Sequence, residues 1–238
     1  MITLKHYKNI IIGTAIFFVL LVSIIIYQHS KDISFLKKEF SVVSIPYGFI
    51  FDMEQNISPK TEIIEGVISV YDEEDRTFAS LGHPVITKND ELPQEGVVMS
   101  FVGENAPQMV GTVTENTFVG CFGKFIPEHT PPIYTRMKIM HPNDIKEGNA
   151  TLLMLDKTKT LKEYEGKLSF RKEGFPLSFS IENENFEGAN EGTSGSIILQ
   201  DGKITAIVCA GDKQKGANKL YAITAYEIVR TMLKHNKN

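Results

Sequence analysis

From residue 61 onward, short hydrophobic or alternating runs dominate the chain, and residues that favour turns separate them. Runs of this length, bounded by Gly, Pro, Asn or Asp, are typical of β-strands. The runs that we expect to form strands are IIEGVISVY, VVMSFV, QMVGTVT, YTRMKIM, ATLLMLD, GKLSFR, PLSFSI, SIIL and KITAIVC. Their spacing predicts an all-β barrel or sandwich and not a βαβ array.

The last segment of the chain has the pattern of an amphipathic helix. Thr224 and Glu227 have the T-x-x-E spacing of a capping box, which marks a helix start. Apolar positions then recur at the spacing of one buried helix face, at Ala225, Ile228, Val229, Met232 and Leu233. Binding to a partner or to a membrane is the alternative use of this face. Packing against the β-domain is the interpretation that we favour.

Residues 10–27, IIIGTAIFFVLLVSIIIY, contain no charge. As a helix they would span roughly 27 Å, close to the thickness of one bilayer core. A cleaved signal peptide is the competing interpretation, but its apolar region is normally shorter and ends in a small-residue cleavage site. We therefore expect an uncleaved single-pass anchor that follows a cytoplasmic N-terminus at residues 1–9. A stalk at residues 28–60, with one strand in FSVVSI, then leads to an exported domain at residues 61–238.

Composition narrows the possible functions. The 238 residues are 42% hydrophobic with a formal net charge of −4, which suits one globular core and gives no support to nucleic-acid binding. No Cys-x-x-Cys pair and no HExxH motif is present, so we expect neither a metal nor another cofactor. Cys121 and Cys209 could pair in an oxidising compartment, although two buried free thiols are the preferred interpretation.

One serine lies in a glycine-rich stretch, GTSGSIIL at residues 192–199. Such a stretch can be a simple turn, or it can present Ser194 as a nucleophile beside an oxyanion hole of backbone N–H groups. A nucleophilic serine needs a base, and histidine is the usual one. Among the six histidines, His83 in TFASLGHPVI stands at a strand end between a glycine and a proline, where a sharp turn would present its ring. A structural role for this histidine is the alternative.

Taken together, residues 66–84, GVISVYDEEDRTFASLGHP, and residues 192–203, GTSGSIILQDGK, resemble the SpoIVB-type serine peptidases (stage IV sporulation protein B). In that family a hairpin ending in Leu-Gly-His delivers the catalytic histidine, and Gly-x-Ser-Gly-Ser carries the nucleophile. The segment GTVTENTFVGCFGKF at residues 111–125 is similar to a family segment that joins the two halves. The resemblance covers roughly residues 61–235.

The resemblance implies a two-barrel, chymotrypsin-like peptidase domain. It implies that His83 is the general base, that Ser194 is the nucleophile, and that the N–H groups of Gly192 and Ser194 form the oxyanion hole. Ser194 Oγ would attack a peptide carbonyl while His83 takes its proton and returns it to the leaving amine. Protein substrates are thus expected, by family analogy an exported segment of another membrane-bound protein.

The chain departs from the family pattern at three points. The Asp-Pro segment about fifteen positions before the serine is absent, and its nearest substitutes as third triad member are Glu182, our first choice, and Asn183. Both can equally belong to a solvated acidic loop. Residues 28–60 are too short for the PDZ domain of long family members, and Ile197 replaces the usual proline after the second serine.

The leading hypothesis is therefore a membrane-anchored serine endopeptidase acting outside the cytoplasm in sporulation signalling. If its role is specific to sporulation, its location would be the intermembrane space of the forespore. The alternative is a catalytically weak or inactive relative that serves as a protein-binding module of the envelope. A third possibility is an unrelated β-rich envelope domain in which the two motifs coincide by chance.

Overall fold

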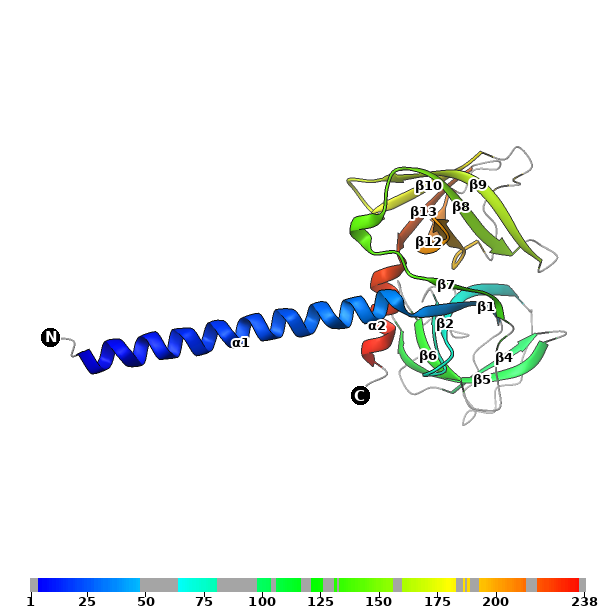
Figure 1. Cartoon of the computed structure of the whole chain (residues 1–238). Coiled ribbons are helices and arrows are strands. Elements are labelled where there is room, and N and C mark those ends of the chain that lie inside the picture. The colour runs from blue at the N-terminus through cyan, green and yellow to red at the C-terminus, as the bar shows by residue number, and fades with distance from the viewer. Residues whose placement is uncertain are drawn as a thin grey trace. The chain divides into compact units, whose positions relative to one another are not determined.

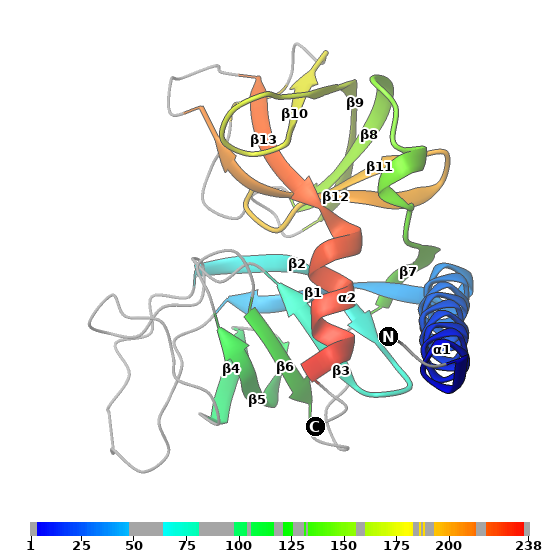
Figure 2. The same ribbon diagram turned by 90° about the vertical axis from the view of Figure 1, so that its left-hand side faces the viewer.

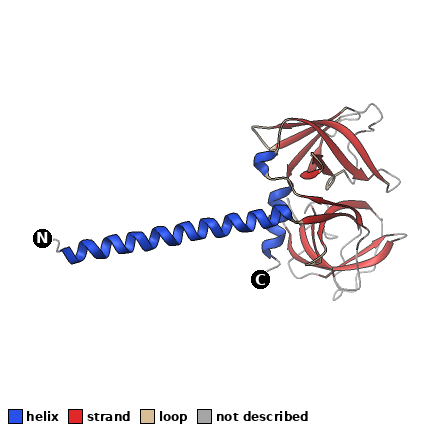
Figure 3. Cartoon of the chain, viewed as in Figure 1, coloured by secondary structure: helices blue, strands red, loops and turns tan. Residues whose placement is uncertain are grey.

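The computed structural model describes residues 4–47, 64–80, 98–103, 106–116, 121–125, 131, 133–155, 160–182, 186, 188, 193–212 and 218–235. The chain divides into two compact units, Met1–Lys38 and Glu39–Asn238. The first unit contains one long helix, and the second contains every described strand together with a C-terminal helix (Figures 1 and 3).

Helix α1 (Leu4–Lys37) runs without interruption through the uncharged segment 10–27. It continues for ten residues past Tyr27, into the stretch that we predicted to be a stalk. Its large apolar side chains from Ile16 to Ile26 are exposed. Among the described residues, however, no helix is long and apolar enough to cross a membrane, so the structure does not support the predicted transmembrane segment.

The N-terminal half of the second unit is an antiparallel seven-stranded sheet in the order β4-β5-β6-β3-β2-β1-β7. Its strands are β1 (Glu39–Tyr47), β2 (Ile64–Asp72), β3 (Thr77–Ser80), β4 (Val98–Gly103), β5 (Ala106–Asn116), β6 (Cys121–Phe125) and β7 (Ile133–Lys138). Strand β1, predicted within the stalk, pairs with β2 and β7 and is thus part of the globular unit. It also contacts β4, so the sheet curls back on itself (Figure 2).

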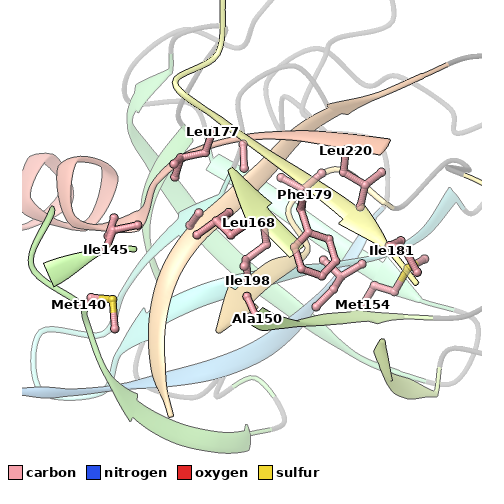
Figure 4. Packing of buried hydrophobic residues seen from close by; sticks show 14 of the residues in the cluster. Met140, Ile145, Ala150, Met154, Leu168, Leu177, Phe179, Ile181, Ile198 and Leu220 are labelled. Carbon is pink, nitrogen blue, oxygen red and sulfur yellow. The ribbon is translucent and has the colours of Figure 1, made fainter. Parts of the chain in front are cut away.

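The C-terminal half is a closed six-stranded barrel in the order β10-β13-β12-β11-β8-β9. Its strands are β8 (Gly148–Leu155), β9 (Leu161–Phe170), β10 (Leu177–Ile181), β11 (Ile197–Gln200), β12 (Lys203–Gly211) and β13 (Lys219–Thr224). The barrel is filled by inward-facing apolar side chains, with the Phe179 ring among Leu168, Ile198 and Leu220 (Figure 4). A short 3-10 helix, η1 (Pro142–Asp144), lies between β7 and β8.

The expectation of an all-β fold is confirmed, and one of the two predicted barrels is closed. For the other half, the described strands form a curled sheet with no hydrogen-bonded ladder between β1 and β4. Helix α2 (Ala225–His235) begins directly after Thr224, as its capping box predicts. Its face Ala225, Ile228, Val229 and Met232 is buried, and the helix contacts both β3 and β12 (Figure 2).

The antiparallel order brings six strand ends together at one end of the barrel. Strands β8, β10 and β12 finish there, and β9, β11 and β13 begin there. We call this end of the barrel the site end, because the turn that contains Ser194 leads into β11 there. Glu182 follows β10 at the same end, but three strands away in a ring of six. The barrel walls that carry Ser194 and Glu182 therefore face each other.

An ion pair fixes the hairpin turn between β2 and β3. Arg136 on β7 donates Nε to Glu73 Oε1 at 2.6 Å and its terminal Nη2 to Glu73 Oε2 at 3.0 Å. The Ser41 hydroxyl on β1 also donates to Glu73. These hydrogen bonds from Arg136 and Ser41 lower the pKa of Glu73 from 4.5 to about 2. Strands β1 and β7 are thus tied to the hairpin that leads toward His83.

We expect Glu73→Gln to lower the free energy of unfolding by less than about 1 kcal/mol at pH 7, because water screens an exposed pair. Since folding lowers the Glu73 pKa, its contribution is complete above about pH 4.5 and is lost as the pH falls through about 2. Urea unfolding at several pH values should therefore show the difference between wild type and variant shrinking over that interval.

A double-mutant cycle supplies the control for this experiment. In an Arg136→Met background, Glu73→Gln should cause little further loss, because its main partner is already gone. A difference between wild type and Glu73→Gln that stays constant from pH 7 to pH 2 would contradict this account of the ion pair.

Candidate active site

Ser194 occupies the corner of a tight turn at the site end of the barrel. The Ser196 N–H donates to the Thr193 carbonyl at 3.1 Å, which closes a four-residue turn. Gly195 has a φ of +91°, and it stands at the third position, where a type II turn requires a positive φ. Thr193 and Ser196 are buried, whereas Ser194 is half-buried. The turn therefore presents the Ser194 side chain to the outside.

Backbone hydrogen bonds attach this turn to β12. The Gly195 N–H donates to the Val208 carbonyl at 2.8 Å, and the Val208 N–H donates to the Ser196 carbonyl at 2.8 Å. They continue the β11–β12 ladder beyond its last paired residues, Ile197 and Ile207. The position of the serine is thus set by the barrel wall itself.

The Ser194 hydroxyl points toward the end of β12. Its Oγ donates to the Cys209 carbonyl at 3.4 Å. This is a long contact compared with the roughly 2.7 Å of a usual hydroxyl–oxygen bond. The hydroxyl therefore lies beside the residue that follows Val208 on β12.

The neighbouring Cys209 is a buried free thiol, as we preferred from the sequence. Burial raises its pKa to about 12. The thiol is consequently protonated near neutral pH, and a protonated thiol is a poor nucleophile. Ser194 thus has no competing thiolate at this position. The side chain of Cys121, on β6, lies outside the described residues.

Two predicted site residues, His83 and Gly192, lie outside the described residues, and so does Asn183. The hairpin that should deliver His83 is present as predicted. Strand β2, the turn 73–76 and β3 follow one another, and β3 ends at Ser80, three residues before the histidine. The roles of His83 as base and of the Gly192 N–H as oxyanion donor stay predictions.

Glu182 is exposed and bound to a lysine. Lys167 Nζ on β9 lies 2.8 Å from Glu182 Oε1, and this hydrogen bond raises the lysine pKa. The Glu182 N–H donates to the Glu165 carbonyl on β9, so the backbone of Glu182 stays hydrogen-bonded to β9. The assignment of Glu182 as third triad member stays a prediction.

The sequence patterns did not reveal a short free stretch of backbone beside Ser194. Strand β12 pairs with β13 as far as Gly211, but its ladder with β11 ends before Cys209. Among the described residues, no strand pairs with Cys209, Ala210 and Gly211 on the β11 side. An extended peptide can add to such an edge through main-chain hydrogen bonds. Only the strand pairing shows this edge, because KITAIVC reads as an ordinary buried strand.

Comparison with known proteins identifies a family for this chain. No curated protein matches it. Among solved structures, the Rv3671c protease from M. tuberculosis, in its active form, is similar in fold, with a TM-score of 0.51 and 11% sequence identity over 85% of this chain and 82% of that one. Residues 87–225 match the family model described as SpoIVB peptidase S55.

This match covers more than half of the chain. It contains Ser194, the turn around it and Glu182, and it begins four residues after His83. The expected family is thus confirmed, and the half of the site that the structure describes lies within the matched region. The chain belongs to the SpoIVB peptidase S55 family.

Proposed function

We propose that this protein is a serine endopeptidase with Ser194 as nucleophile and His83 as general base. The observation that carries the proposal is the half-buried Ser194 hydroxyl at the corner of a glycine turn, in a chain of a peptidase family. The neighbouring Cys209 thiol is protonated near neutral pH, so it does not compete with the serine hydroxyl as a nucleophile.

In the proposed reaction, Ser194 Oγ attacks the scissile carbonyl and transfers its proton to His83, which then protonates the leaving amine. Water releases the acyl group by the same steps in reverse. The N–H groups of Gly192 and Ser194 are the proposed donors to the oxyanion. Gly195 and Ser196 use their own N–H groups to hold the turn, which is consistent with this assignment.

We propose that the substrate is an extended peptide lying along Cys209–Gly211. The Ser194 hydroxyl reaches the Cys209 carbonyl, so a chain paired with this edge would pass directly by the nucleophile. Main-chain hydrogen bonds supply affinity for many peptide sequences, and pockets for alternate side chains supply the specificity. This fits an enzyme that cuts within an exposed, flexible segment of another protein.

We further propose that residues 10–27 anchor the protein in the cell membrane, with the peptidase domain outside the cytoplasm. Support comes from the uncharged sequence and from the exposed apolar side chains of α1. The described helices give no support, because none of them is long and apolar enough to cross a membrane. By family analogy, the substrate would be an exported segment of another membrane-bound protein during sporulation, within the intermembrane space of the forespore.

A second candidate function is an inactive relative that binds proteins in the envelope. One specific observation favours it: Glu182, the nearest substitute for the missing acidic residue, is held by Lys167 on the outer surface. Such a protein would keep the open edge of β12 for binding but would not activate Ser194. Active-site labelling separates the two candidates.

A fluorophosphonate should label the wild-type protein covalently at Ser194, and Ser194→Ala should abolish the labelling because the nucleophile is gone. Intact-mass and peptide mass spectrometry measure both results. Ser196→Ala is the matched control, since Ser196 is fully buried two residues away, and it should still be labelled. An unlabelled wild-type protein with a native fold would instead favour the binding module.

Glu182→Gln tests the third triad member. If Glu182 orients His83, the rate of peptide cleavage should fall at least about 10²-fold, because a wrong imidazole tautomer costs up to about 10⁴-fold in serine proteases. Lys167→Met is the control: it removes the ion-pair partner and should leave the rate largely unchanged. Equal rates in wild type and Glu182→Gln would point to a Ser–His dyad or to Asn183.

If residues 10–27 are an uncleaved anchor, the mature protein should keep its own N-terminus and resist carbonate extraction from membranes. N-terminal sequencing and immunoblotting of the membrane fraction measure this. Residues 39–238 expressed alone should stay in the supernatant. Recovery of a soluble form that begins near residue 28 would identify a cleaved signal instead.

A further inference from the structure

The side chain of Tyr221 links two charged side chains from different parts of the chain. The Tyr221 hydroxyl on β13 donates to Asp212 Oδ1 at 2.9 Å. The guanidinium carbon of Arg171 lies 4.3 Å from the centroid of the Tyr221 ring, within the range of a cation–π contact. Asp212 directly follows β12, and Arg171 directly follows β9. All three side chains are half-buried.

The backbone reinforces this arrangement. The Asp212 N–H donates to the Lys219 carbonyl at 3.1 Å, so the chain leaving β12 stays against β13. Tyr221 is paired with Ala210 on one side and with Ser178 on the other. Its hydrogen bond to Asp212 raises the pKa of the Tyr221 phenol, which keeps the donating proton in place.

These contacts lie beside the open edge of β12. The edge consists of Cys209, Ala210 and Gly211, and Asp212 is the next residue. At its first residue, the Cys209 carbonyl receives the Ser194 hydroxyl. At its far end, the Tyr221 hydroxyl holds Asp212 from the β13 side, and Arg171 packs on the Tyr221 ring. A free strand edge keeps a fixed geometry only if its other side is well held.

We propose that Arg171, Tyr221 and Asp212 are positioning residues that hold the end of β12 in place for an extended substrate. The inference rests on the proposed function, and it deepens that function by locating the substrate residues that lie beyond the reacting bond. These side chains act through β12 and do not touch the reacting atoms. They should therefore affect peptide binding but not the reactivity of Ser194.

Tyr221→Phe is the sharpest test, because it keeps the ring under Arg171 and removes only the hydroxyl. Two probes are needed: a fluorophosphonate with a short alkyl chain, and a fluorogenic peptide selected from a library that the wild-type enzyme cleaves. The rate of fluorophosphonate labelling should stay unchanged. For the peptide, kcat/KM should fall about three- to tenfold through KM, as expected for one lost hydrogen bond.

Binding of the same peptide to the Ser194→Ala protein, measured by fluorescence anisotropy, gives a readout that is independent of catalysis. Adding Tyr221→Phe should weaken this binding by the same factor. Asp212→Asn keeps an acceptor oxygen and should retain most of the affinity, whereas Asp212→Ala should not. Tyr134→Phe, which changes an exposed tyrosine on β7, is the matched control and should alter neither probe.

The possible outcomes separate the inference from the proposed function. Normal labelling with unchanged peptide affinity in Tyr221→Phe would overturn the inference alone. Equal losses in labelling and in peptide cleavage would also overturn it, because the network would then act on the nucleophile. If Asp212→Asn weakens the binding only of peptides that contain Lys or Arg, Asp212 recognises the substrate charge directly, and the positioning role is wrong. An unlabelled wild-type protein would contradict the proposed function, and the inference with it.

Discussion

Two backbone hydrogen bonds between the serine turn and β12 determine the geometry of the candidate site. They join Gly195 and Ser196 to Val208, and they end the β11–β12 ladder at the point where Ser194 turns outward. Because this pairing stops at Val208, no described residue pairs with Cys209–Gly211 on the β11 side, and the Ser194 hydroxyl reaches the Cys209 carbonyl. The proposed nucleophile and the proposed substrate edge thus arise from the same short piece of sheet. A turn without a residue that tolerates a positive φ at position 195 would disturb both together.

The barrel order explains how distant parts of the sequence reach one site. In a closed antiparallel barrel, alternate strands end on the same rim, so the ends of β10 and β12 lie at the rim where β11 begins. Ser194, Glu182 and Asp212 are there for this reason. Their roles differ because their neighbours differ. Lys167 holds Glu182 on the surface, whereas Tyr221 holds Asp212 against the strand that flanks the nucleophile.

Short sequence patterns predicted those elements that depend only on neighbouring residues. Alternating runs gave most of the strands, and the T-x-x-E spacing gave the start of α2 at the correct residue. Strand β6 was not predicted because its sequence, CFGKF, contains an internal glycine and lysine. Strand β13 was not predicted because polar residues precede its sequence, KLYAIT. The assignment of Ser194 as nucleophile rests on a motif of five residues and stays a prediction. The open edge, the Glu182 ion pair and the Tyr221 network depend on strand order, which no single segment encodes.

The central claim is that Ser194 is the nucleophile of a peptidase whose substrate lies along β12. A crystal structure of the protein treated with a peptidyl phosphonate tests this claim most directly. The account predicts phosphorus bonded to Ser194 Oγ, the peptide antiparallel to Cys209–Gly211, and a His83 ring nitrogen within about 4 Å of Oγ. An adduct at another residue, or a His83 ring more than about 10 Å from Ser194 Oγ, would contradict it.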